Sequence, residues 1–217
     1  MALQPRYSGP KIECIGHLIG EAFEKAGIDA KNARVLQVEP RSFRLNVATD
    51  FVSRIPPQNA DTDSRPFHIV DLDNFERLPY GDNEFDFVYV RRTLEATSNP
   101  GWICKEMERV GRRGLIECAS PVTEITKGVG RFHKLQSLGY PESQYIVMPT
   151  EVSQGSDGTP VGVGVSFVPK LPVIEHIPFK KIGHDNFLRQ LLKSDMMWTA
   201  YFPWEGAIDA KTWTAGR

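Results

Sequence analysis

Three short apolar runs in the middle of the chain restrict its fold more than any other feature. They cover residues 67–71, 85–90 and 114–118, and polar turns or one periodic segment separate them. Runs that are apolar on both faces of an extended strand belong in a parallel sheet that helices cover on both sides. We therefore expect an α/β fold built on a mostly parallel sheet, with a crossover helix between the last two runs.

Two more strands are expected before these runs. Residues 34–40 form the first strand, which Pro40 ends, and residues 45–51 form a weaker second one. Residues 53–66 are rich in Pro, Asn, Asp and Ser, a composition that is typical of a loop. The strand at 67–71 is therefore the third of the sheet, 85–90 is the fourth and 114–118 is the fifth.

The spacing of apolar residues also predicts two helices that lie on the sheet. After an irregular arm at residues 1–10, apolar residues from 12 to 26 recur at helical spacing, and Gly27 stands at the place of a C-cap. The crossover helix follows a start signal at Asn99 and Pro100 and continues to Val110.

Beyond Ser120 the pattern changes, and we expect an antiparallel C-terminal addition to the sheet. Residues 144–148 and 161–168 alternate as strands do and are expected to pair as a hairpin. The other expected elements are a short helix near 122–127 within a loop at 121–143, a short helix at 186–192, an aromatic strand at 198–204 and a tail over the last dozen residues.

Charge and composition argue against several classes of protein. Lys and Arg number 26 and Asp and Glu 27, so bulk charge gives no strong signal for nucleic-acid binding. No secretory signal pattern and no apolar run of about 20 residues is present. We expect a soluble, intracellular protein of the cytoplasm or an organellar matrix, with no membrane partner. Three cysteines without a CxxC pair predict neither a disulfide framework nor a zinc site.

The central segment resembles the class I S-adenosylmethionine-dependent methyltransferases, of the methyltransferase type 11 kind. Residues 78–89 read LPYGDNEFDFVY, close to the family pattern LPFxDxSFDxVYxxxxLEH, and the similarity covers residues 33–121. The resemblance implies a Rossmann-like sheet with helices on both faces, S-adenosylmethionine as cofactor, and a small-molecule or macromolecular methyl acceptor. It divides the chain into an N-terminal arm and helix (1–32), a methyltransferase-like core (33–121) and a C-terminal elaboration of the same domain (122–217).

In this family the cofactor lies across the carboxyl ends of the parallel strands. An acidic residue that ends the second strand binds the ribose hydroxyls, and one at the end of the third strand lies beside the adenine. The resemblance assigns these roles to Asp50 and to Asp71, which Leu72 follows. The alternative for both carboxylates is that they are solvated at strand ends and accept hydrogen bonds from loop amides.

The turn after the first strand departs from the family. The family's pattern at this place resembles VLDIGxGxxP, whereas residues 35–42 of this chain read VLQVEPRS. Gln37 therefore replaces the aspartate, and Glu39 and Arg41 replace the two glycines. Side chains there occupy the ligand's volume, and glycine is the residue that most freely adopts the positive φ of such a turn. The Glu39 carboxylate would repel the methionine carboxylate of the cofactor, while Arg41 could clasp it. We expect Glu39 or Arg41 to fill part of the pocket.

The fourth strand ends in Arg91 and Arg92, where the family has a small or polar residue and then histidine. Either arginine could face the cofactor or an anionic substrate, but not both, because adjacent strand residues point to opposite faces. The alternative is that both pair with nearby carboxylates. No residue is identified as a catalytic base, and no spacing of His and carboxylates predicts a metal site.

Two functions from different classes remain open. The chain is either a methyltransferase with an unknown acceptor or a catalytically inactive protein of that fold, which serves as a binding or structural subunit of a larger assembly and has protein partners. The altered glycine turn and the missing histidines favour the second, and Asp50, Asp71 and the segment 78–89 favour the first. Binding of S-adenosylmethionine or S-adenosylhomocysteine distinguishes the two.

Overall fold

The computed structural model describes residues 6–8, 13–40, 44–56, 63–126, 142–150, 162–170 and 199–213. The α-helices are α1 (Glu13–Ala26), α2 (Pro100–Val110) and α3 (Pro121–Thr126). Two short 3₁₀ turns are η2 (Leu72–Asn74) and η3 (Leu94–Ala96). The strands are β1 (Arg6–Ser8), β2 (Val35–Val38), β3 (Asp50–Ser53), β4 (Phe67–Ile69), β5 (Phe87–Arg91), β6 (Arg113–Ala119), β7 (Tyr145–Pro149), β8 (Val163–Pro169), β9 (Thr199–Glu205) and β10 (Ile208–Thr212).

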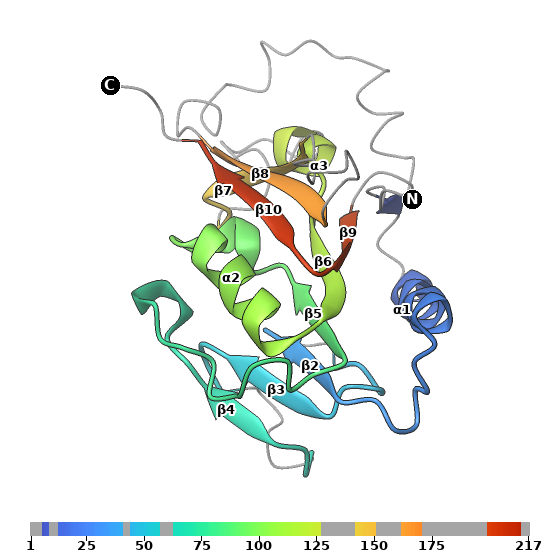
Figure 1. Cartoon of the computed structure of the whole chain (residues 1–217). Helices are drawn as coiled ribbons and strands as arrows, with labels where there is room; N and C mark the ends of the chain where they lie inside the picture. Colours follow the sequence, from blue (N-terminus) through green and yellow to red (C-terminus); the bar gives the residue numbers. More distant parts are fainter. Residues whose placement is uncertain are drawn as a thin grey trace, which may run out of the picture.

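The strands form two sheets, a seven-stranded one in the order β1-β9-β6-β5-β2-β3-β4 and a three-stranded one in the order β10-β8-β7 (Figure 1). The neighbours from β6 to β4 in the larger sheet are all parallel. Strand β9 is antiparallel to β6, and β1 is antiparallel to β9. The expected mostly parallel, Rossmann-like sheet is therefore confirmed.

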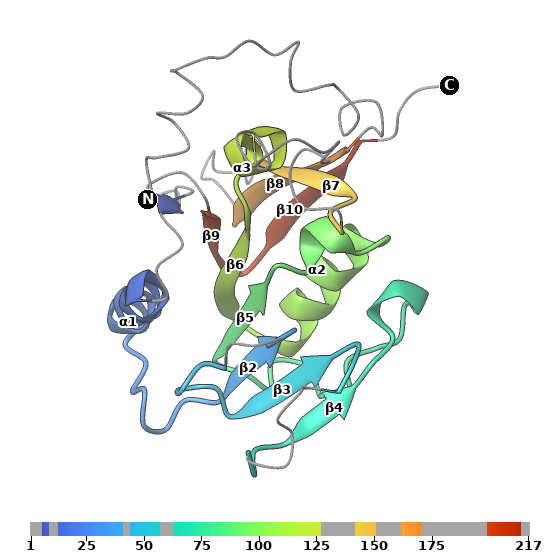
Figure 2. The ribbon, with the colours of Figure 1, turned by 180° about the vertical axis from the view of Figure 1, so that it is seen from behind.

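Helices lie on both faces of the larger sheet, as expected (Figures 1 and 2). Alternate residues of β2 show this, because Val35 packs in a cluster with α1 whereas Leu36 packs in a cluster with α2. Helix α1 buries the apolar stripe that its sequence spacing predicted, and it ends at Gly27, whose φ of 63° is the left-handed value of a C-cap.

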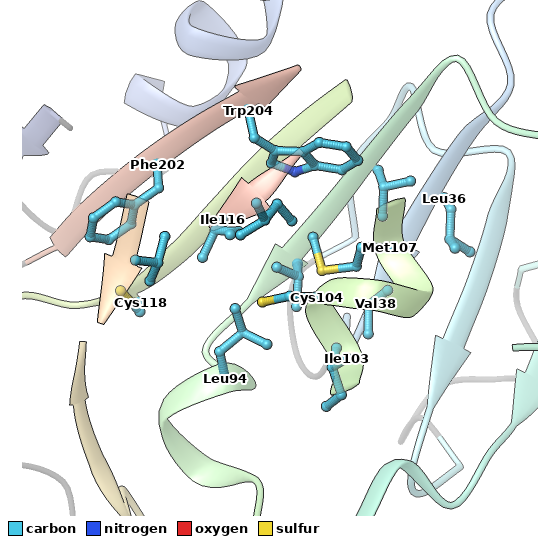
Figure 3. Close-up of a cluster of buried hydrophobic side chains, with 14 of the residues drawn as sticks. Leu36, Val38, Leu94, Ile103, Cys104, Met107, Ile116, Cys118, Phe202 and Trp204 are labelled. Carbon is cyan, nitrogen blue, oxygen red and sulfur yellow. The ribbon is translucent and has the colours of Figure 1, made fainter. Parts of the chain in front are cut away.

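The main core lies around α2. Figure 3 shows Ile103 and Met107 of this helix among side chains of β2, β6 and β9, with Trp204 across the cluster. The apolar runs at 85–90 and 114–118 are buried as their pattern predicts, with exposed fractions of 0 to 3% at Phe87, Val88, Leu115 and Ile116. The two cysteines on this core, Cys104 and Cys118, are buried free thiols.

The C-terminal addition is more mixed than the sequence predicted. Strands β7 and β8 pair antiparallel as the expected hairpin, but β10 joins β8 in parallel. Residues 208–212 are therefore a strand rather than a tail, and residues 6–8 form β1 rather than an irregular arm. Strand β10 is held because Ile208 enters the main core and because β10 contacts α2. The expected helix at 186–192 lies outside the described residues.

The second strand of the core begins later than expected. Strand β3 runs from Asp50 to Ser53, whereas the sequence pattern placed a strand at residues 45–51. The chain turns instead before Asp50, where the Ala48 amide donates to the Leu45 carbonyl. The buried Gln37 side chain accepts a hydrogen bond from the Leu45 amide and holds this turn against β2.

Within the described ranges, no helix is long and apolar enough to cross a membrane.

Candidate functional site

The strand order places the candidate site between β2 and β5. From β2 the chain continues outward to β3 and β4, and it then returns to the other side of β2 as β5. Ligands of open α/β sheets bind at such a reversal, outside the carboxyl ends of the strands. Glu39 follows β2 at this point and Arg92 follows β5.

Both of these residues have a left-handed backbone. The φ angle is 55° at Glu39 and 53° at Arg92, a region that residues other than glycine seldom adopt. Such a conformation costs on the order of 1–3 kcal/mol and persists where the surroundings hold it. Here the Glu39 amide donates to the Val52 carbonyl at 2.7 Å, and the Arg92 amide donates to the Glu117 carbonyl at 2.8 Å. The first turn thus keeps a glycine-like backbone although its sequence lacks the glycine.

The Glu39 side chain is buried at the carboxyl edge of the sheet, with 3% of its surface exposed. Its carboxylate accepts hydrogen bonds from the Arg54 amide at 2.7 Å, the Arg54 Nε at 3.1 Å and the Ser53 hydroxyl at 3.2 Å. The side chain therefore lies across the end of β3. Whether Glu39 fills part of a cofactor pocket stays a prediction. Arg41, the other residue expected to do so, lies outside the described residues.

Arg54 joins this carboxylate to a second one. Its Nη1 donates to Asp73 Oδ2 at 3.1 Å and to the Ala96 carbonyl at 3.4 Å. Asp73 also accepts hydrogen bonds from the Thr97 hydroxyl at 2.8 Å and the Ser98 amide at 2.9 Å. We call Glu39, Arg54 and Asp73 the strand-end cluster.

Sequence reasoning missed two members of the strand-end cluster. Because the second strand was placed at residues 45–51, Arg54 fell in a loop and not directly after a strand end. Correct bounds for β3 would have placed Arg54 at the carboxyl edge, next to the switch between β2 and β5. Asp73 had no comparable signal, because its role depends on the fold of η2.

Burial and the hydrogen bonds that Asp73 accepts both change the pKa of its carboxyl. Partial burial raises the pKa of its carboxyl, but hydrogen bonds from Ser98, Thr97 and Arg54 outweigh that effect and hold the pKa below its ordinary value. A depressed carboxyl pKa contributes stability above the pKa of the unfolded state, and this stability is lost as the pH falls through the folded value.

Replacing Asp73 with Asn is therefore expected to destabilise the protein near neutral pH and to matter progressively less in acid. The difference in unfolding free energy between wild type and Asp73→Asn should shrink as the pH falls below about 4, the ordinary carboxyl range. Urea unfolding of both proteins between about pH 3 and pH 7 measures this difference. A difference that stays constant over this range would contradict the ion-pair role of Asp73.

Asp50 does not end the second strand, and that expectation is wrong. It is the first residue of β3 and therefore lies at the amino edge of the sheet, opposite the strand-end cluster. Its carboxylate accepts a hydrogen bond from the Thr49 hydroxyl at 2.6 Å and pairs with Arg34 at 3.4 Å. The assignment of Asp50 to the ribose depended on a carboxyl-end position and loses its basis.

Asp71 follows β4 at the carboxyl edge, where the sequence placed it. Its side chain is exposed and caps the η2 turn, accepting hydrogen bonds from the Asp73 amide at 3.2 Å and the Asn74 side chain at 2.6 Å. Leu72 is fully buried in the main core. A role for Asp71 or Leu72 beside an adenine stays a prediction.

The two arginines at the end of β5, Arg91 within the strand and Arg92 after it, each pair with a buried carboxylate. Arg91 Nε donates to Glu117 Oε1 at 3.1 Å, and the Tyr89 hydroxyl donates to the other oxygen of that carboxylate. Nη1 of Arg92 lies 3.3 Å from Oε1 of Glu95. The same carboxylate oxygen accepts a hydrogen bond from the backbone amide of Ala119 at the end of β6. The pairing alternative describes these contacts, and a cofactor role for Arg91 stays a prediction.

The connection from β2 to β3 offers no helix to a ligand in its described part. Residues 39–40 and 44–49 of this connection contain no helical residue. In doubly wound sheets, the amides at the start of such a helix bind the anionic part of the ligand. Among the described residues, no group of His, Cys, Asp and Glu could hold a metal ion.

Comparison with known protein families gives one match in the central part of the chain. Residues 20–116 match the family model described as a methyltransferase domain. A search of curated proteins found no match.

Three solved structures illustrate the structural likeness. An S-adenosylmethionine-dependent methyltransferase from Mesorhizobium loti is 11% identical at a TM-score of 0.37, over 46% of this chain and 54% of that protein. CalH, solved with S-adenosylhomocysteine, is 12% identical at a TM-score of 0.34, over 41% of this chain and 32% of its own. YcgJ from Bacillus subtilis is 12% identical at a TM-score of 0.43, over 88% and 98%.

The chain thus spans about half of the M. loti enzyme and a third of CalH. The family match and the strand order show that the central part of this chain has the fold of the class I S-adenosylmethionine-dependent methyltransferases.

Proposed function

We propose that this chain is a catalytically inactive protein of the methyltransferase fold, which serves as a binding or structural subunit of a larger assembly with protein partners. One observation carries the proposal: the Glu39 carboxylate is buried at the switch point and bound by Arg54. In this fold, the cofactor needs that place for its own approach to the backbone.

Charge and backbone geometry both support this proposal. A carboxylate at the end of β2 repels the methionine carboxylate of the cofactor, and the repulsion is stronger in a partly buried crevice than in water. The described part of the following connection contributes no helix start that would attract an anion. Each arginine described at the carboxyl edge, Arg54, Arg91 and Arg92, pairs with a carboxylate of the chain itself.

The second candidate is an active S-adenosylmethionine-dependent methyltransferase with a small-molecule or macromolecular acceptor. The family match and the exposed Asp71 carboxylate at the end of β4 favour it. Methyl transfer can proceed by proximity and orientation when the acceptor is already nucleophilic, so the lack of an identified base does not count against it.

Calorimetric titration with S-adenosylhomocysteine and S-adenosylmethionine tests the proposal. We expect a dissociation constant of about 1 mM or weaker, equivalent to roughly 4 kcal/mol of binding free energy or less. A constant in the low micromolar range would overturn the proposal and favour the methyltransferase.

Replacing Glu39 and Arg41 together with glycine then separates two reasons for weak binding. Recovery of binding in the double variant would show that these side chains exclude the cofactor. Continued absence of binding, in a variant with wild-type circular dichroism, would place the obstacle elsewhere in the crevice.

A further inference from the structure

We infer that Arg54 is an internal occupant of the carboxyl edge, an autoinhibitory contact that takes up acceptor groups a ligand would use there. Its guanidinium engages the carboxylates of Glu39 and Asp73, both of which could otherwise accept hydrogen bonds from a ligand. The inference rests on the proposed function, because it identifies the side chain that closes the site. The ligand class that this contact excludes is one with neighbouring hydroxyl groups, such as the ribose of an adenine nucleoside.

The Arg54 side chain contacts segments that follow three other strands at the carboxyl edge of the sheet. The residue directly follows β3, and its guanidinium extends to Glu39 after β2, to Asp73 after β4 and to the Ala96 carbonyl after β5. It therefore joins segments on both sides of the switch point between β2 and β5. Arginine suits this role because it presents five N–H donors in a rigid planar arrangement.

Electrostatic attraction stabilises the contact between the Arg54 guanidinium and the carboxylates of Glu39 and Asp73. Burial lowers the pKa of the Arg54 guanidinium, but the Glu39 and Asp73 carboxylates outweigh burial and raise the pKa above its usual value. Arg54 therefore stays charged over the whole accessible pH range. A neutral ligand would have to displace two charged partners at once, which costs more than displacing water.

Both carboxylates keep other hydrogen bonds when the guanidinium is removed. Glu39 retains the backbone amide of residue 54 and the Ser53 hydroxyl, and Asp73 retains the Thr97 hydroxyl and the Ser98 amide. Neither is left as a buried carboxylate without a donor, which is the costly case. An Arg54→Ala variant is therefore expected to fold, with lower stability than wild type because the buried Glu39 charge loses its cationic partner, and to expose two carboxylates at the edge.

Calorimetric titration of wild type and Arg54→Ala with S-adenosylhomocysteine and with adenosine tests the inference. The matched control is Arg113→Ala, since Arg113 has a similar side-chain exposure (23% against 22%) and also pairs with a glutamate, but lies at the amino end of β6. We expect Arg54→Ala to bind adenosine, which has no carboxylate for Glu39 to repel, about tenfold more tightly than wild type, and Arg113→Ala to bind it as wild type does. Arg54→Met, which keeps an unbranched stem of similar length but has no hydrogen-bond donor, replaces Arg54→Ala if that variant does not fold.

The outcomes separate this inference from the proposed function. If the folded Arg54 variant binds neither compound better than wild type, the inference is overturned, whereas weak binding by wild type still supports the proposed function. If wild type binds S-adenosylhomocysteine in the low micromolar range and the variant gains nothing, both are overturned. If wild type binds tightly and the variant binds tenfold more tightly still, only the proposed function is lost.

Discussion

Replacing Gly114 with alanine is expected to lower the free energy of unfolding by about 3 kcal/mol or to prevent folding. A Cβ at this position would lie 2.0 Å from the Val88 carbonyl oxygen and 2.7 Å from Nε1 of Trp204. Val88 is the partner of Gly114 in the parallel pairing of β5 and β6, at the centre of the larger sheet. Backbone on one side and a buried indole on the other leave the methyl group no room, so the strands would have to separate.

Gly20→Ala is the matched control for this prediction. Gly20 lies inside α1, its surface is exposed, and a methyl group added there would have no other atom within 4 Å. Alanine there is expected to raise the unfolding free energy by about 0.5–1 kcal/mol, because glycine in a helix has more entropy to lose. Thermal and urea unfolding measure both variants, and a Gly114→Ala protein as stable as wild type would contradict the close packing of β5 on β6.

The second large effect is expected at Lys170, whose side chain is fully buried. Its Nζ lies 3.1 Å from Glu124 Oε2, and the Glu124 side chain is fully buried as well. Removing one partner of a buried ion pair leaves an uncompensated charge and typically costs about 3–5 kcal/mol. Lys170→Ala is expected to lower the unfolding free energy by about that amount, because it removes a charged donor from a carboxylate whose side chain is fully buried.

A double variant and a surface variant make this test specific. Lys170→Met combined with Glu124→Leu removes both charges and is expected to recover most of the lost stability, because apolar residues of similar size often replace a buried pair without loss. Lys105→Ala removes the partner of Glu108 on the surface of α2, where the lysine side chain is 69% exposed, and is expected to change stability by less than about 1 kcal/mol. A single Lys170 variant as mild as Lys105→Ala would contradict the buried pair.

Sequence patterns predicted the elements that are buried on both faces. Strands β2, β5 and β6 were placed within a few residues because continuous apolar runs bounded by turns allow few alternatives. Strand β3 was displaced because residues 45–51 carry as much apolar character as 50–53, and only the turn held by Gln37 decides between them. Strand β10 was missed because its sequence is polar in three of five positions and its placement depends on β8 and α2.

The candidate site was predictable only in part, for a related reason. The altered first turn was visible because a short motif of adjacent residues defines it. The partner of Glu39 was not, because Arg54 lies 15 residues further along the chain and reaches Glu39 through the pairing of β2 with β3. Contacts of this kind depend on strand register, which a single sequence does not specify.

The position of β9 inside the larger sheet affects how the protein can fold during synthesis. Strand β9 lies between β1 and β6, and its pairing joins Ala119 to Thr199. Until those late residues leave the ribosome, β6 presents an open edge of unpaired backbone groups, which is a site for association with other chains. Completion of the sheet therefore has to wait until residues 199–205 have been translated, about 80 residues after β6 itself.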